Sequence, residues 1–267
     1  MDERIPFLDL LLRRERAVTA AGLAVITGLS WLWLIVMASD MPNMAMPGMS
    51  MVTVLAADPA SWSALNFGLT AVMWAVMMVA MMLPSAAPMI LIYGLARRRQ
   101  QEKGRGGDYA SNGAFAAGYL FVWAGFSLAA TGLQWGLEQA ALLLPTMVSA
   151  SPWLGGGLLI GAGLYQFTPL KQACLVRCRA PFEFLSRHWR PGAGGAFAMG
   201  LHHGAYCLGC CWVLMALLFV LGVMNLAWVG ALAAFVLLEK LIPRGALLGR
   251  LAGVALIAWG IVVIVAG

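Results

Sequence analysis

The chain has 267 residues, of which 62% are hydrophobic and 10% are charged, and its mean hydropathy is +0.85. Soluble domains carry about 25% charged residues, so this composition excludes an ordinary soluble protein and predicts an integral membrane protein. The net charge is +6 and the pI is about 9.4, but no basic motif with interleaved aromatic residues accompanies them. We therefore assign the positive charge to contact with anionic membrane lipid, and we expect no nucleic-acid partner.

Apolar stretches long enough to cross a membrane recur along the chain. A membrane-spanning helix needs about 20 mostly apolar residues. Seven such stretches lie at about 17–38, 64–96, 111–142, 153–170, 194–220, 223–240 and 247–266. The sequence thus predicts an all-α, polytopic transmembrane bundle with about seven spans, in one domain over 17–267 after a cytoplasmic segment, 1–16. A tight turn at 222–225 leaves six or eight spans open as alternatives.

The basic residues predict the orientation of the chain. All 17 Lys and Arg residues fall in four clusters, within 4–16, 97–105, 171–190 and 240–250. With seven spans all four clusters lie on one side, which the excess of Lys and Arg in cytoplasmic loops identifies as the cytoplasm. We predict a cytoplasmic N-terminus and an external C-terminus. The first apolar stretch exceeds the roughly 7 to 15 residues of a signal-peptide core and predicts a retained anchor, with cleavage near Ala38 as the alternative.

Three connecting segments differ in composition. The external segment 39–63 lacks basic residues, and its Pro and Gly content predicts an irregular loop. The cytoplasmic segment 97–110 is charged and Gly-rich, which predicts a flexible linker. In the cytoplasmic segment 171–192 aromatic and basic residues alternate, which predicts a short amphipathic helix on the membrane surface.

The stretch HHGAYCLGCCW, residues 202–212, places two histidines and three cysteines in an apolar region. On a helix, His203, Cys207 and Cys211 follow one another at i, i+4 and i+8, and Cys210 lies one turn from Cys207. We expect His202 to face another direction. Thiolate and thioether ligands select Cu(I) and other soft ions, and imidazole suits copper and zinc, so these residues match copper better than magnesium or calcium. The alternative is that the cysteines only pack as small apolar residues.

The second apolar stretch is rich in methionine. Two adjacent rows at i+4 spacing are formed by Met73, Met77 and Met81 and by Met78 and Met82. Pro84 and Pro88 follow, and each proline removes a backbone hydrogen bond and kinks a helix. The carbonyl groups that are freed need neighbours or a water-filled cavity. This favours a functional interior beside the methionine-rich face, and a purely structural kink is the alternative. Methionine is also a common filler of cores.

Five further methionines lie in the external segment, where apolar packing does not explain them: Met41, Met44, Met46, Met49 and Met51. Thioethers bind without deprotonation, so they can bind Cu(I) in an oxidising compartment. We take Met44, Met46 and Met49 as candidate external ligands. The candidate ligands in the second stretch are Met77, Met78, Met81 and Met82.

A second cysteine pair, Cys174 and Cys178, has C-x-x-x-C spacing, which places both thiols on one face of a helix. Pro169 should either kink the fourth span or begin a new helix, and a new helix would point the pair at the cytoplasm. We expect the neighbouring Lys and Arg side chains to favour the thiolate form by lowering the thiol pKa.

Two acidic residues lie at the ends of predicted spans, Glu138 and Glu239. Acidic residues within spans are costly and often functional, but Glu239 can also extend to the membrane edge or pair with Lys240. Serine-nucleophile motifs, phosphate-binding glycine loops and paired carboxylates are absent from the sequence. We therefore lean against an enzyme.

Three motifs together resemble an uncharacterised family of bacterial integral membrane proteins described as predicted metal-binding: WAVMMVAMMLP, YQFTPLKQACLVRC and CLGCCWVLMALLFVLGVMNLAWVGALAAFVLLEK. The resemblance extends from about Ser63 to the end of the chain. It implies a multi-pass protein of the bacterial inner (cytoplasmic) membrane. It also implies a metal site at Cys174, Cys178, Cys207, Cys210 and Cys211.

The leading hypothesis is a copper-handling membrane protein. External methionines would capture Cu(I), the second span would relay it, and His203 with its three neighbouring cysteines would hold it. Cys174 and Cys178 would receive or deliver the ion at the cytoplasmic side, and the partner would be a periplasmic copper carrier or a cuproenzyme. Storage or delivery fits as well as transport. Two alternatives remain: a membrane thiol-disulfide oxidoreductase, and an assembly or scaffold subunit without metal.

Overall fold

The computed structural model describes residues 4–40, 62–102, 111–140, 142 and 151–266. Within these ranges the chain is helical and contains no strand, which confirms the predicted all-α class. The helices are α1 (Arg4–Asp40), α3 (Ala64–Glu102), α4 (Ser111–Gln139), α5 (Pro152–Tyr165), α6 (Pro169–Arg179), α7 (Pro181–His188), α8 (Gly192–Ala216), α9 (Leu218–Leu221), α10 (Leu226–Leu241) and α11 (Gly245–Ala266).

In the described part of the chain, five helical segments are long and apolar enough to cross a membrane: 16–39, 64–101, 112–139, 192–221 and 245–266. Two predicted spans are shorter, because α5 has 14 residues and α10 has 16. At a rise of about 1.5 Å per residue, neither covers the roughly 30 Å of hydrocarbon in a bilayer. The chain is thus a membrane-type helical bundle, and the count of seven crossings stays a prediction.

The predicted fourth span, 153–170, is interrupted. Helix α5 ends at Tyr165, and Pro169 begins α6 after the N-cap residue Thr168, whose side chain accepts a hydrogen bond from the Lys171 amide at 3.3 Å. Proline suits the first turn of a helix, where its missing N–H has no partner to lose. The proline therefore begins a new helix, which is one of the two outcomes that the sequence left open.

Three predicted segments differ in part from the helices of the structure. Helix α1 begins at Arg4, so no break separates the predicted segment 1–16 from the first span. Helix α3 continues to Glu102, so the first part of the predicted linker is helical. The amphipathic helix exists as α7, but it packs against α3 and α6 with Phe184 and Leu185 buried, so it does not lie only on a membrane surface. Most of the external methionine loop, 41–61, lies outside the described residues.

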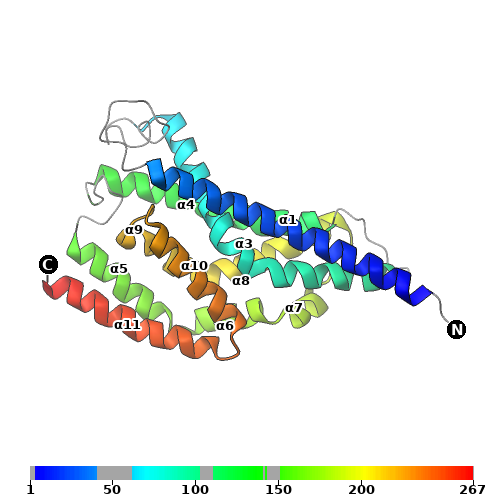
Figure 1. The fold of residues 1–267 in the computed structure, drawn as a ribbon. Coiled ribbons are helices and arrows are strands. Elements are labelled where there is room, and N and C mark those ends of the chain that lie inside the picture. The colour runs from blue at the N-terminus through cyan, green and yellow to red at the C-terminus, as the bar shows by residue number, and fades with distance from the viewer. Residues whose placement is uncertain (1–3, 41–61, 103–110, 141, 143–150, 267) are drawn as a thin grey trace.

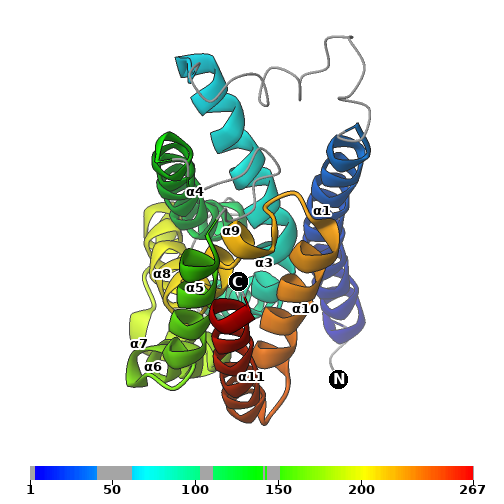
Figure 2. The same cartoon turned by 90° about the vertical axis from the view of Figure 1, so that its left-hand side faces the viewer.

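Helix α3 occupies the centre of the bundle (Figure 2), where it contacts α1, α4, α7 and α10. Helix α8 packs against α4 and α6, and α5 packs against α11. The outer helices α1 and α11 expose large apolar side chains such as Leu29 and Val262, at 60% each, as lipid contact requires. The start of α1 and the end of α11 lie at opposite ends of the molecule (Figure 1).

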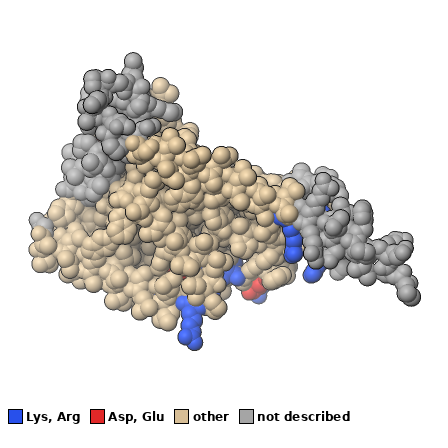
Figure 3. Space-filling model, viewed as in Figure 1, with Lys and Arg blue, Asp and Glu red and all other residues tan. Residues whose placement is uncertain are grey.

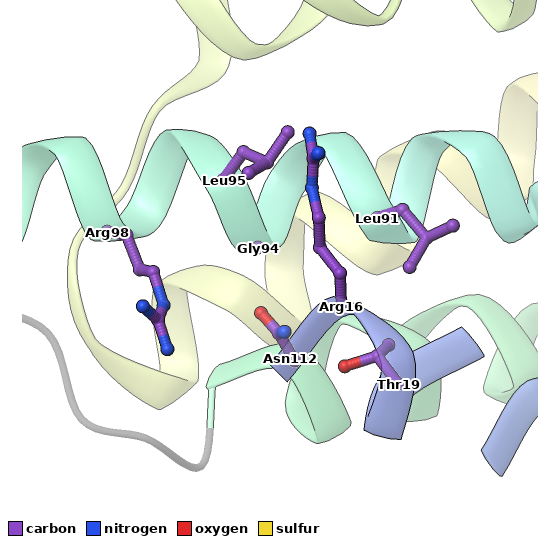
Figure 4. Close-up of a pocket in the computed structure, with 7 residues that line it drawn as sticks. All are labelled: Arg16, Thr19, Leu91, Gly94, Leu95, Arg98 and Asn112. Atoms are coloured by element: carbon purple, nitrogen blue, oxygen red, sulfur yellow. The ribbon is translucent and has the colours of Figure 1, made fainter. Parts of the chain in front are cut away.

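Exposed Lys and Arg side chains are unevenly distributed over the surface drawn in Figure 3. On the face drawn in Figure 3 they follow the lower and right-hand edge, and the tan surface toward the left-hand end shows none. Arg16 of α1, Arg98 of α3 and Asn112 of α4 line a small pocket where the three helices meet (Figure 4). That all four basic clusters lie on a single side stays a prediction, as does the assignment of that side to the cytoplasm.

Helices α4 and α8 touch through glycine. A Cβ atom added at Gly118 would clash with the carbonyl oxygen of Phe197, and one added at Gly200 would clash with that of Phe115. Small residues allow such close approach of helices in membranes. This contact fixes Tyr119, which follows Gly118 on α4, beside the cysteines of α8.

Candidate metal centre

Four of the five cysteines meet in the core. Helix α8 directs Cys207, Cys210 and Cys211 inward, each at most 1% exposed. Cys178 of α6 joins them, since its thiol contacts those of Cys207 and Cys210. All five cysteines are free thiols. Helix α6 therefore supplies a sulfur ligand candidate that lies far from the other three in sequence.

Met82 of α3 completes this group, with its Sδ 4.0 Å from the Sγ of Cys211. A soft ion that binds two sulfurs at about 2.3 Å each holds them at most about 4.6 Å apart, so this separation allows one ion between them. Met77, Met78 and Met81 are also buried, so the methionine-rich face of α3 points into the bundle. The methionine and cysteine clusters meet, which the sequence left undecided. We name Met82, Cys178, Cys207, Cys210 and Cys211 the sulfur cluster.

Two polar side chains contact the sulfur of Cys207, and a third, Ser85, binds one of them. The ammonium of Lys240 lies 2.8 Å from Cys207 Sγ and donates to Ser85 Oγ at 2.9 Å. The Tyr119 hydroxyl lies 3.1 Å from the same sulfur and donates to the Met82 carbonyl at 3.0 Å. Sequence reasoning missed Ser85 and Tyr119 entirely. Lys240 carried a usable signal, because a charge at the end of an apolar stretch often marks a functional site.

The other two α8 thiols donate to their own helix. Cys210 Sγ and Cys211 Sγ lie 3.0 and 3.1 Å from the carbonyl oxygen of Cys207. As donors, these thiols carry their protons. Metal ligation by cysteine requires the thiolate, so binding at this cluster would release protons.

His203 is 1% exposed and enclosed by aromatic rings, with centroids 5.8 Å from Tyr119 and 5.8 Å from Phe184. Its Nδ1 atom has no hydrogen-bond partner within the described residues. Buried polar atoms are nearly always paired, so an unpaired imidazole nitrogen needs an explanation such as an absent ion. His203 shares the buried side of α8 with Cys207 but contacts aromatic rings.

The predicted orientation of the Cys174 and Cys178 pair is wrong. Cys178 is buried in the sulfur cluster, and Cys174 is half-buried against Gly209, where a Cβ atom would lie 2.7 Å from its sulfur. Burial raises the pKa of the Cys174 thiol, against a smaller lowering effect of Arg177. Hydrogen bonding to Cys207 and Cys210, together with burial, raises the pKa of Cys178. The pair is thus no activated thiolate pair facing the cytoplasm.

The basic neighbours of that pair are engaged elsewhere. Lys171 forms a 2.6 Å ion pair with Glu239, and both side chains are almost fully buried. Arg179 donates to the Ile242 carbonyl. Glu239 therefore does not pair with Lys240, because consecutive helical residues point about 100° apart. Glu239 reaches α6 while Lys240 reaches the sulfur cluster.

Two further expectations concern polar groups near the membrane. Pro84 leaves the Ala80 carbonyl without its helical donor, and the indole nitrogen of Trp31 supplies one at 3.1 Å. This confirms that neighbours satisfy a freed carbonyl.

Glu138 accepts hydrogen bonds from Trp62 at 2.8 Å and from Gln134 at 2.9 Å, so this carboxylate joins α4 to the segment before α3.

Across the described residues, no three His, Cys, Asp or Glu side chains are arranged to hold a metal ion. A metal centre in this arrangement must therefore include the Met82 thioether or involve movement of the thiols. The external candidates Met44, Met46 and Met49 lie outside the described residues.

A family model described as copper chaperone, PpoB2, matches residues 71–263. The matched region contains the whole sulfur cluster, His203 and the methionine-rich face of α3. Comparisons with curated proteins and with solved structures gave no match.

Proposed function

We propose that this chain, which belongs to the PpoB2 copper chaperone family and so has a copper-handling role, binds Cu(I) at the sulfur cluster. The observation that carries the proposal is the 4.0 Å approach of Met82 on α3 to Cys211 on α8, with three further thiols around it. A thioether and thiolates from three helices form a donor set for a soft ion.

Cu(I) fits this donor set better than the commoner divalent ions. Magnesium and calcium require oxygen ligands, and no carboxylate takes part in the cluster. Structural zinc sites are almost always tetrahedral with four His or Cys ligands, and no such set is prearranged in the described residues. Burial also keeps water away from the thiols, as the stable handling of a reduced ion requires.

Lys240 gives the copper-free cluster a positive charge of its own. Its ammonium nitrogen lies 2.8 Å from Cys207 Sγ, and Lys240 is only 8% exposed. A buried ammonium requires a counter-charge. When Cu(I) binds Cys207, the ion supplies the positive charge beside this sulfur, and Lys240 retains Ser85 as its hydrogen-bond partner.

The remaining roles follow from the same picture. Cu(I) is captured outside by Met44, Met46 and Met49 and is relayed by Met77, Met78 and Met81. Cys174 exchanges it at the end of the bundle that carries Arg177, Arg179 and Arg187, which we name the arginine-rich end. His203 supports the ion next to the cluster. The chain acts in the bacterial inner membrane and exchanges copper with a periplasmic carrier or delivers it to a cuproenzyme.

The test is the copper content of detergent-purified protein after anaerobic loading with Cu(I), measured by mass spectrometry. Wild type should retain about one or more copper ions per chain, and a Cys207→Ser/Cys210→Ser/Cys211→Ser variant should lose at least one. Met199→Leu, at a buried methionine of α8 outside the cluster, is the matched control. Equal copper content in wild type and the triple variant would refute the proposal. A mixed disulfide with a partner, trapped by Cys210→Ser without copper binding, would point to an oxidoreductase.

A further inference from the structure

Two histidines outside the sulfur cluster face each other. His188 ends α7 and His202 lies in the first half of α8, and their ring centroids are 5.9 Å apart with an interplanar angle of 42°. Although His202 is next to His203 in sequence, it points away from the core toward α7 and is exposed. The pair therefore joins two helices at the arginine-rich end.

The ring of His188 is oriented by the backbone. Its Nδ1 atom lies 3.1 Å from the carbonyl oxygen of Phe184, one turn earlier on α7. A carbonyl can only accept, so the hydrogen is on Nδ1 and the lone pair is on Nε2. Metal-binding histidines almost always donate their other N–H to a carboxylate, a backbone carbonyl or water in this way.

The separation of the two rings suits a shared ion. A metal–nitrogen bond of about 2.0–2.1 Å places the metal about 3 Å from the ring centroid. Two imidazoles on opposite sides of one ion therefore have centroids about 6 Å apart. The observed centroid separation of 5.9 Å matches this value.

One member of the pair lies at a cleft. His188 lines a cleft together with Arg177, Arg187 and Tyr206. Phe184 stacks on His188 with centroids 5.0 Å apart and also contacts the His203 ring at 5.8 Å.

From His203 the contacts continue inward. Its ring lies 5.8 Å from that of Tyr119, whose hydroxyl is 3.1 Å from Cys207 Sγ. His203 also offers the unpartnered Nδ1 atom. Ring contacts thus connect His188 to His203 through Phe184, and His203 to the sulfur cluster through Tyr119.

We infer that His188 and His202 form a second copper site, in which two imidazole nitrogens bind Cu(I) beside the cleft that His188 lines. The inference rests on the proposed function, because the sulfur cluster is the source or the destination of the ion. Neutral imidazoles are weaker ligands for a soft ion than thiolates, so this site exchanges copper faster than the cluster. It is the step at which copper enters or leaves the arginine-rich end.

The test compares purified full-length wild type with a His188→Gln/His202→Gln variant after anaerobic loading with excess Cu(I). The copper content of each protein is measured, and X-ray absorption identifies the nitrogen and sulfur ligands of the copper. The double variant should lose about one copper ion per chain together with the nitrogen ligands, and should transfer its remaining copper to a chelator more slowly. Ser186→Ala, an exposed change on the same helix, should match wild type.

Reciprocal variants separate this inference from the proposed function. The variant with serine at 207, 210 and 211 should keep the nitrogen-bound copper after losing the sulfur-bound ion. Unchanged copper content and unchanged nitrogen ligands in the double histidine variant would overturn the second site alone. Copper without sulfur ligands in wild type would overturn the proposed function, whatever the histidine variant shows. If the double variant does not fold, His202→Gln alone, at an exposed position, should still remove the nitrogen-bound ion.

Discussion

The sulfur atoms of Met82 and Cys211 lie 4.0 Å apart although 129 positions separate the two residues in the chain. The contact forms because α3 runs through the centre of the bundle. Helix α4 packs against both α3 and α8, and α10 packs against α3, so the cluster is held against α3. Both side chains are fully buried. The thioether is therefore held beside the thiols by the packing of the helices.

Met82→Leu removes this thioether while keeping a similar side-chain volume. We expect Cu(I) affinity to fall by about tenfold or more, equivalent to about 1.4 kcal/mol, with little change in stability because the exchange conserves core volume. Competition with a Cu(I) chelator measures the affinity. Met199→Leu, at a buried methionine of α8 outside the cluster, is the control and should retain wild-type affinity. Equal affinities for both variants would exclude Met82 as a ligand.

Lys240→Met removes the buried ammonium. The copper-free protein should lose about 1–3 kcal/mol of stability, because Ser85 and Cys207 lose a buried hydrogen-bond partner. The copper-loaded protein should lose less, since the ion then supplies the positive charge at Cys207. Thermal unfolding with and without Cu(I) gives the two differences. An equal loss in both states would show that Lys240 does not respond to copper.

Hydropathy and helical spacing predicted much of the fold. They gave the all-α class, the positions of the long helices and a buried α8 face with His203, Cys207 and Cys211. They did not give the partners of polar groups. Periodicity reports which side of a helix a residue occupies, but not which distant helix lies opposite.

The lysine partners illustrate this limit. Lys240 reaches Cys207 and Lys171 reaches Glu239 across 33 and 68 positions. From the sequence alone, Lys240 is the expected ion-pair partner of Glu239. The packing of α6 against α10 makes Lys171 the partner instead. The same packing turned Cys178 inward and so reversed the expected exposure of its pair.

Gly200→Ala tests the contact that positions Tyr119. The added Cβ would meet the backbone of Phe115, which cannot move without separating α4 from α8. We expect a stability loss of about 1–3 kcal/mol, typical of overpacking, together with weaker Cu(I) binding. Gly194→Ala on the same helix, where nothing lies within 4 Å, should be neutral or stabilising. Thermal unfolding and chelator competition on both variants provide the comparison, and a neutral Gly200→Ala would show that the close contact is dispensable.

Cys174 should be the most reactive thiol in the folded, copper-free protein, and still a slow one at neutral pH. It is half-buried, whereas the four thiols of the sulfur cluster are buried. Because burial raises its pKa, the thiol stays protonated near pH 7, and its thiolate fraction grows tenfold per pH unit until the pH reaches the raised pKa. Alkylation by iodoacetamide should therefore follow a pH profile shifted above that of a free thiol, and Cys174→Ser should abolish the modification. A profile shifted below that of a free thiol would contradict this prediction. It would show that Arg177 lowers the pKa of Cys174 by more than burial raises it, as the basic neighbours in the sequence predicted.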